Sequence, residues 1–205
     1  NLTFETLDGL IKHNGPILNK TKLDKILGRN FFKNKINFNQ SPSLEAQIAS
    51  ISDDIAYNSH DLEDGLNAKL FTLKDISKIP ILNSLIKRHK TKIAKYSQEL
   101  VLRQIIREII NEMVKDVILN TNKNLKKNNI KNIKDVYKSK YPLVSFSNKM
   151  KVFDKSVKSF LKKNMYYHKN VIHKTNLGKK IVKKLFFKIK KNPKKFVKNH
   201  NVKKI

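Results

Sequence analysis

The sequence predicts an all-α protein, and two observations support this fold class. Only five glycines and five prolines interrupt the 205 residues, and apolar side chains recur at the three- and four-residue spacing of helices. Hydrophobic residues make up 39% of the chain, which is enough for a core, in one domain or two small ones. The chain has no cysteine, which excludes disulfides and cysteine-based metal sites.

A short helix is predicted at the start of the chain. It should span residues 1–13 and end at the turn Asn14-Gly15-Pro16. Its expected apolar contacts are Leu2, Leu7, Leu10 and Ile11. Residues 17–40 are expected to be mostly irregular, with one helical turn near residues 22–27.

A long helix is predicted next, over residues 41–70. Ser41 is its expected N-cap, with Pro42 at the first helical position. A further helix should begin at Thr72 and break near Pro80. Residues 81–119 predict one or two strong helices. Their expected buried face is Leu100, Ile105, Ile109, Met113 and Val117.

The Asn- and Lys-rich residues 120–132 predict a linker between two regions. Beyond it, helices are expected around residues 147–165 and 176–190, followed by a frayed tail. The predicted organisation is therefore a first domain at 1–119, the linker at 120–132, a helical C-terminal region at 133–190 and a basic tail at 191–205.

The chain is strongly basic, with 45 Lys and Arg against 16 Asp and Glu and a net charge of +29. Such a field attracts polyanions, including nucleic acid and nucleotides. The alternative is that an AT-rich genome has enriched every surface in lysine. No apolar run approaches the roughly 20 residues that cross a bilayer. The N-terminus lacks the pattern of a signal peptide, so a cytoplasmic location is expected. It also lacks Met, which suggests that the sequence begins inside a longer protein.

Residues 36–68 depart from this basic character, because they contain no Lys or Arg and six acidic residues. At about 100° per residue, one face of the long helix carries polar side chains: Asp53, Tyr57, His60, Asp61 and Asp64. The opposite side carries an apolar stripe: Leu44, Ile48, Ile51, Ile55, Leu62 and Leu66. An ordinary solvated face is one interpretation. The other is a functional face, because carboxylates bind divalent cations and an aromatic ring packs on a sugar or base.

The histidines do not by themselves indicate a metal centre, since none forms an HxxxH or HExxH pair. His60 and Asp61 are adjacent, so their side chains point about 100° apart on a helix. His13 is expected to cap a helix end. His89 lies in the basic run Lys87-Arg88-His89-Lys90, which suits phosphate contact better than metal, although such a cluster is more often solvated. Glycine-rich phosphate loops and GxSxG motifs are absent from the sequence.

Several segments resemble a known family. They are NLTFETLDGLIKHNGP, PSLEAQIASISDDIAYNSHDLEDGL, FLKKNMYYHKNV and IVKKLFFKIKKNP. In this order along nearly the whole chain, they resemble the deoxyguanosine-triphosphate triphosphohydrolase-like proteins of the HD-domain superfamily. The resemblance implies an HD-domain-type helical bundle and hydrolysis of a deoxynucleoside triphosphate to deoxynucleoside and triphosphate. It also implies roles for three residues: Asp53 would bind metal, Tyr57 would pack on the deoxyribose and Asp61 would contact the sugar 3′-hydroxyl.

The sequence also departs from the family pattern. The family's first metal-binding His and its His-Asp dipeptide lie upstream, and this sequence opens just after them. The resemblance therefore assigns one metal ligand of four and no catalytic residue to this chain, with Asp54 as the alternative ligand if the register is shifted. A divalent ion such as Mg²⁺ or Mn²⁺ would bind only with the upstream ligands supplied. The chain alone is predicted to be inactive.

The expected substrate is a dNTP resembling dGTP, with a homo-oligomer or a separate N-terminal chain as protein partner. No membrane partner is expected, and Lys87, Arg88 and Lys90 receive no role from the family. Two alternatives stay open. One is a basic protein that binds single-stranded nucleic acid, and the other is a degenerate fragment without catalysis.

Overall fold

The computed structural model describes residues 2–17, 36–89, 91 and 95–196. In these residues all regular secondary structure is helical, which confirms the all-α prediction and is consistent with an HD-type helical bundle. The helices are α1 (Phe4–Lys12), α3 (Leu44–Asn67), α4 (Leu73–Ile76), α5 (Pro80–Arg88), α7 (Gln98–Lys127), α8 (Ile133–Lys138), α9 (Asn148–Leu161), η1 (Lys162–Tyr166), α10 (Lys169–Lys191) and α11 (Pro193–Phe196).

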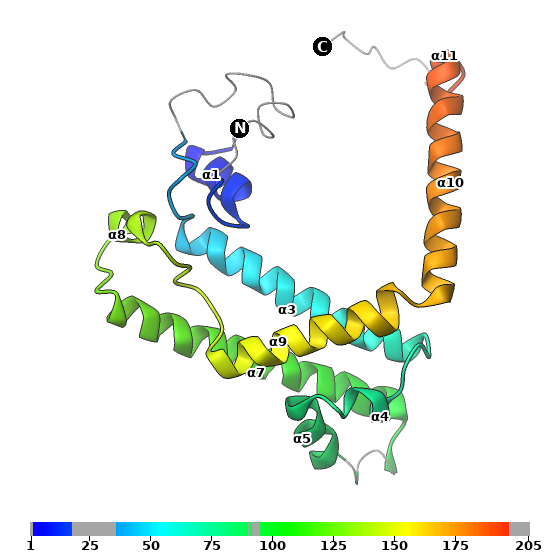
Figure 1. Cartoon of the computed structure of the whole chain (residues 1–205), viewed down its shortest axis with the longest axis horizontal. Helices are drawn as coiled ribbons and strands as arrows, with labels where there is room; N and C mark the ends of the chain where they lie inside the picture. The colour runs from blue at the N-terminus through cyan, green and yellow to red at the C-terminus, as the bar shows by residue number, and fades with distance from the viewer. Residues whose placement is uncertain (1, 18–35, 90, 92–94, 197–205) are drawn as a thin grey trace.

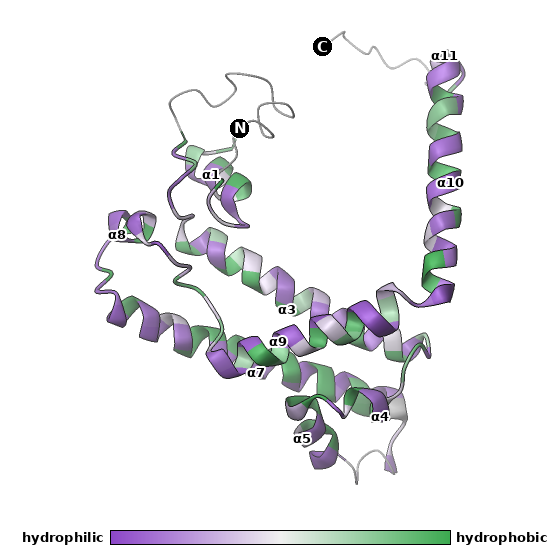
Figure 2. Ribbon diagram, in the orientation of Figure 1, coloured by the Kyte–Doolittle hydropathy of each residue, from purple (hydrophilic) through white to green (hydrophobic). Residues whose placement is uncertain are grey.

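The core forms where α3, α7 and α9 pack together (Figure 1). Hydrophobic residues alternate with hydrophilic ones along these helices, as amphipathic packing requires (Figure 2). The central side chains are almost fully buried: Leu62, Ile105, Ile109, Met113, Val157 and Leu161. Four of the five residues predicted on the buried face of 81–119 are buried. Leu100 is the exception at 59% exposed, because the first turn of α7 buries its neighbours Val101 and Leu102 instead.

The first helix has the expected end but not the expected contacts. It stops at Lys12, with His13 as C-cap. Leu2 and Leu10 are largely exposed, which contradicts the prediction. The buried pair is ionic: Lys12 Nζ lies 2.7 Å from Asp8 Oδ1, and it donates a 3.2 Å hydrogen bond to the Asn37 carbonyl. Partners on both sides satisfy the lysine, which is what permits its burial.

The long helix begins two residues later than predicted. Ser43, not Ser41, is the N-cap, and its hydroxyl accepts a hydrogen bond from the Ala46 N–H. Ser41 is buried, and its own N–H donates to the Tyr137 carbonyl at 3.1 Å. A tertiary contact therefore holds Ser41 outside the helix, where Pro42 cannot serve as the first helical residue.

Two helix starts follow local capping chemistry. Thr72 caps α4 in a reciprocal capping box with Asp75, as the prediction of a start at Thr72 requires. Pro80 is the first residue of α5, so it begins a helix, whereas the preceding helix already ends at Ile76 with Ser77 as its C-cap. Ser147 caps α9, within the region where a helix was predicted.

The predicted linker is helical over most of its length, because α7 continues to Lys127. Two of its asparagines bind the segment before α9. Asn120 donates to the Ser145 carbonyl at 2.8 Å, and Asn124 donates to the Leu143 carbonyl at 2.9 Å. The low-complexity sequence is thus part of the packed structure up to Lys127. The division into domains stays a prediction.

The last long helix, α10, begins at Lys169, seven residues before the predicted start. His168 provides its N-cap by accepting from the Asn170 N–H. The predicted turn at 22–27 and the tail beyond residue 196 lie outside the described residues.

Gly65 offers a test of packing within α3. A Cβ added there would collide with the Phe71 ring, which is buried and makes an edge contact with Phe160 at a centroid distance of 4.9 Å. We expect Gly65→Ala to lower the free energy of unfolding by about 1–3 kcal/mol, since overpacking outweighs the gain in helix propensity. Gly178→Ala is the matched control, because nothing lies within 4 Å of its Cβ position. Urea unfolding measures both, and equal effects would contradict the proposed collision.

Candidate functional site

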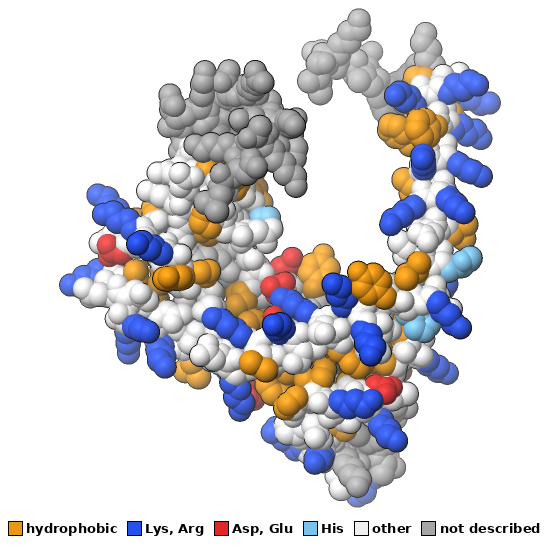
Figure 3. Space-filling view, viewed as in Figure 1, with side chains coloured by type: hydrophobic (Ala, Val, Ile, Leu, Met, Phe, Trp, Pro, Cys, Tyr) orange, Lys and Arg blue, Asp and Glu red, His pale blue; other side chains and the backbone are white. Residues whose placement is uncertain are grey.

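The three residues singled out by the resemblance lie on one continuous helix. Asp53, Tyr57 and Asp61 fall within α3 at intervals of four residues, so they occupy successive turns of one face. Asp53 is exposed, Tyr57 is 64% exposed and Asp61 is half-buried. Acidic side chains lie in the hollow between the N-terminal region and α10 (Figure 3). We call Asp53, Tyr57 and Asp61 the α3 ridge.

The opposite side of α3 positions this ridge by packing into the core. Ile55 and Leu62 are buried, while Leu44, Ile51 and Leu66 pack partly buried against the core. Ile48 is 48% exposed, contrary to the predicted stripe. Near the N-terminal end of α3, the buried side includes Ala46, because α1 packs there. The Cβ position of Gly9 in α1 lies 3.5 Å from Ala46 Cβ.

Asp61 has a partner that the sequence did not indicate. The Tyr166 hydroxyl, on the π-helical segment η1, donates a short hydrogen bond to Asp61 Oδ2. Tyr166 is 46% exposed, and partial burial of its ring, followed by the hydrogen bond to Asp61, raises its pKa from 10.0 to about 12. The two residues are 105 positions apart. The only signal in the sequence was the Tyr166-Tyr167 pair within a segment that carried the resemblance.

This hydrogen bond predicts an unusual tyrosine titration. A raised pKa means that the neutral phenol is favoured in the folded protein, so the contribution to stability is complete below pH 10 and is lost between about pH 10 and 12. We expect absorbance at 295 nm to show one tyrosine that ionises near pH 12, and Tyr166→Phe should remove that component. If Tyr166→Phe instead removed a tyrosine that ionises near pH 10, the hydrogen bond between Tyr166 and Asp61 would be contradicted.

Asp54, the alternative metal ligand, is engaged in a second cluster. Lys158 Nζ lies 3.1 Å from Asp54 Oδ2 and 3.0 Å from Asp154 Oδ2. Asn58, buried in α3, donates to Asp154 Oδ1 at 2.9 Å. Partial burial opposes the charge of Lys158, but the hydrogen bonds to Asp154 and Asp54 outweigh it and raise the pKa of the lysine. Asp54 therefore already has a cationic partner, which it shares with Asp154. Among the described residues Asp53 has no ion-pair or hydrogen-bond partner for its carboxylate.

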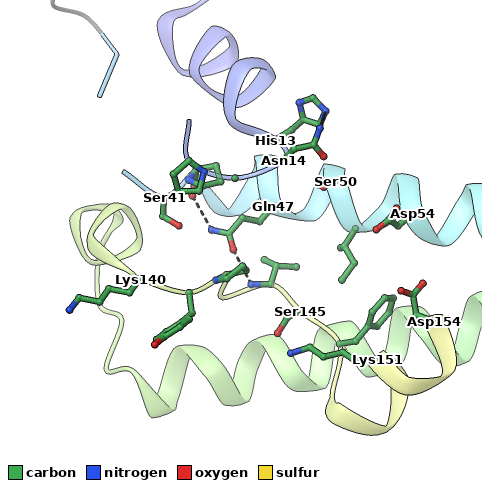
Figure 4. A pocket seen from close by; sticks show the side chains of 18 residues that line it. His13, Asn14, Ser41, Gln47, Ser50, Asp54, Lys140, Ser145, Lys151 and Asp154 are labelled. Atoms are coloured by element: carbon green, nitrogen blue, oxygen red, sulfur yellow. Dashed lines mark hydrogen bonds between the residues drawn. The ribbon is translucent and has the colours of Figure 1, made fainter. Parts of the chain in front are cut away.

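The two neighbouring aspartates face different concavities. Asp53 lines a groove of about 760 Å³ between α1, α3 and α8, together with Glu5, His13, Glu45 and Tyr137. Asp54 and Asp154 line a cavity of about 330 Å³ that lies between α3, α9 and the segment before α9 (Figure 4). A one-residue shift of register would therefore change both the concavity and the electrostatic surroundings of the metal ligand.

Asp53 fits a hard cation as one free oxygen ligand. Within the ranges that the structure describes, no group of three or more His, Asp or Glu side chains could hold a metal ion. The described residues therefore do not complete a metal site, and Asp53 as a metal ligand stays a prediction.

The histidines outside the ridge have structural partners. His13 caps α1 as predicted, with Nδ1 2.7 Å from the Leu10 carbonyl. His89 is 3% exposed and its Nε2 lies 2.8 Å from Glu108 Oε1. Arg88 also reaches Glu108, at 3.5 Å. Phosphate contact by His89 is therefore contradicted by its burial. Lys90 lies outside the described residues.

The fold and the ridge define a class: an all-α protein that presents two carboxylates and a phenol on one exposed helix face. No family model matches the chain. The chain is 50% identical over 203 residues to a Pelagibacter ubique protein named deoxyguanosinetriphosphate triphosphohydrolase-like protein, an alignment that covers 99% of the chain and 55% of that protein. Proteins with the same name match from Bartonella henselae (39% identity over 203 residues, 94% of the chain and 49% of the protein) and Brucella ovis (36% over 198 residues, 91% and 48%).

The chain is thus a homologue of deoxyguanosinetriphosphate triphosphohydrolase-like proteins along nearly its whole length, which confirms the resemblance found in the sequence. It spans about half the length of these curated relatives. Among the described residues, no helix combines the length and apolar character that a membrane crossing requires.

Proposed function

We propose that this chain forms one wall of the active site of a metal-dependent deoxynucleoside triphosphate triphosphohydrolase. The observation that carries the proposal is the α3 ridge. On its successive turns lie a carboxylate with no partner among the described residues, an exposed phenol and a tyrosine-bound carboxylate. The 50% identity to a protein named for this activity supports the same assignment. The substrate is a deoxynucleoside triphosphate, and the products are the deoxynucleoside and inorganic triphosphate.

Each ridge residue has a role that follows from its surroundings. Asp53 offers a free oxygen ligand at the edge of a groove. Tyr57, one turn further, presents an exposed ring to the deoxyribose. Asp61 accepts the hydrogen bond of the sugar 3′-hydroxyl with the oxygen that Tyr166 leaves available, and Tyr166 holds its carboxylate in place. A divalent ion, when bound, polarises the phosphoester and activates water.

The chain needs further ligands for this activity. A catalytic metal requires several protein ligands, and of the described residues we assign only Asp53 to it. We infer that the remaining ligands come from a complementary part of the protein, which corresponds to the length of the relatives that the alignment does not cover. By itself the chain binds nucleotide weakly and does not turn it over.

The proposal is tested by reconstitution. The 205-residue chain is assayed for triphosphate release from dGTP with Mn²⁺, alone and mixed with the portion of the Pelagibacter ubique relative that lies outside the alignment. Release is expected only from the mixture, and Tyr57→Ala in this chain should reduce it. A dATP or GTP arm tests base and sugar preference. Robust metal-dependent release by the chain alone would overturn the division of ligands, and a mixture that assembles without hydrolysing any dNTP would overturn the activity.

A further inference from the structure

Helix α10 presents an apolar face that nothing in the described structure covers. Its chief helix contacts are with η1 before it and α11 after it, and none of its residues is buried. It stands away from the bundle of α3, α7 and α9 (Figure 1). The exposed apolar side chains include Leu177 at 52%, Ile181 at 57% and Leu185 at 51%.

These side chains share one side of the helix. At about 100° per residue, Leu177, Ile181 and Leu185 lie within about 80° of one another. Val182 and Phe186 widen this face to roughly half of the circumference. Seven of the nine lysines of the helix lie on the other half. Lys174 and Lys188 lie on the apolar side, one turn before Leu177 and one turn after Leu185, and the helix has no acidic residue. Phe187 is the one aromatic residue on the lysine side, and it touches Phe186 edge-on at 5.6 Å between centroids. Figure 3 shows lysine side chains along α10 with hydrophobic ones between them.

A continuous apolar face of this kind marks a docking surface. The alignment with the Pelagibacter ubique relative covers 203 residues of this chain and therefore includes α10, while 55% coverage of the relative leaves a large part of that protein unmatched. A second copy of this chain is a poor occupant, because each copy carries a charge of +29 and nine lysines border the face.

We propose that the apolar face of α10, centred on Ile181 and Leu185, docks the complementary part of the protein, which corresponds to the unmatched length of its relatives. The matching surface is apolar at its centre and acidic at its rim, where it meets the lysines of α10. This inference rests on the proposed function for the existence of the complementary part, but docking and catalysis are measured separately.

The test uses the full chain and, as probe, the unmatched portion of the Pelagibacter ubique relative. Binding is measured by calorimetry, and hydrogen exchange reports the amides of α10. We expect a complex in which α10 becomes protected. Leu185→Ser should weaken binding at least about tenfold, since a buried leucine contributes about 1.5–3 kcal/mol. Phe187→Ser, on the opposite side of the same turn and similarly exposed, should change it less than about twofold.

Equal weakening by the two variants would overturn the docking face, as would a complex in which α10 exchanges as fast as in the free chain. Three other results would assign a different occupant and overturn the proposal. The first is a concentration-dependent dimer of this chain that Leu185→Ser disrupts. The second is binding to anionic phosphatidylserine vesicles that protects the amides of α10 from exchange. The third is binding to single-stranded DNA that protects the same amides. Docking without triphosphate release would leave this inference standing and contradict only the proposed function.

Discussion

Replacing Asp53 with asparagine is expected to reduce triphosphate release by the reconstituted enzyme at least about 100-fold. Loss of a residue that merely hydrogen-bonds to a metal ligand reduces activity by up to about 100-fold, and loss of a ligand itself should cost at least as much. The amide retains the size of the side chain but removes the negative charge that a hard cation requires. The carboxylate of Asp53 is exposed and has no partner among the described residues, so the folded structure should not change. Steady-state assays with Mn²⁺ measure the loss, and circular dichroism checks the fold.

Asp54→Asn is the matched control for this experiment. Its carboxylate lies next in sequence but pairs with Lys158 at 3.1 Å. Loss of a partly exposed ion pair costs at most about 1 kcal/mol, so activity should fall less than about fivefold. The reverse order, with Asp54→Asn inactive and Asp53→Asn active, would show that the metal ligand is Asp54 and that the assigned register is wrong by one residue.

Gln47→Ala is expected to produce the largest loss of stability, about 3–5 kcal/mol, because it would leave three backbone groups without partners. The Gln47 side chain is buried in α3. Its Nε2 donates to the Pro42 carbonyl at 2.9 Å, and its Oε1 accepts from the N–H groups of Leu143 and Val144 at 2.8 and 3.1 Å. One amide thus joins α3 to the segment before α9 (Figure 4).

The loss is measured by urea unfolding, with Gln104→Ala as control. Gln104 is an exposed glutamine in α7, and among the described residues its side chain donates only to Glu108, at 3.1 Å. Its removal should cost about 0.5 kcal/mol. The loss from Gln47→Ala is a large share of the 5–15 kcal/mol typical of a domain. If the two variants lost equal stability, Gln47 would not have the joining role that its contacts indicate.

Helical periodicity was sufficient to predict much of the fold. The apolar repeats that predicted helices over residues 81–119 correspond to α5 and α7, and the repeat in residues 41–70 corresponds to α3. The spacing of Asp53, Tyr57 and Asp61 needs only a continuous helix, and α3 provides one. Their chemical roles stay predictions until the reconstituted enzyme is assayed.

The structure departs from the local sequence pattern where tertiary contacts compete with local preference. Ser41 has the local chemistry of an N-cap, but the bond from its N–H to Tyr137 holds it outside the helix. The asparagines of residues 120–127 resemble a linker, yet Asn120 and Asn124 are held by residues 143–145. Composition gives no information on such partners, because a polar side chain suits solvent and a buried hydrogen bond equally well.

The sequence by itself determined the all-α class, the family resemblance and the placement of the acidic side chains on one helix face, because helical geometry relates residues three and four positions apart. The tertiary structure decided which of those side chains are free. It paired Asp54 with Lys158 and Asp61 with Tyr166, across 104 and 105 residues, and it gave the carboxylate of Asp53 no partner among the described residues. Contacts over such separations depend on how α3, α9 and η1 pack, and no local pattern encodes that packing.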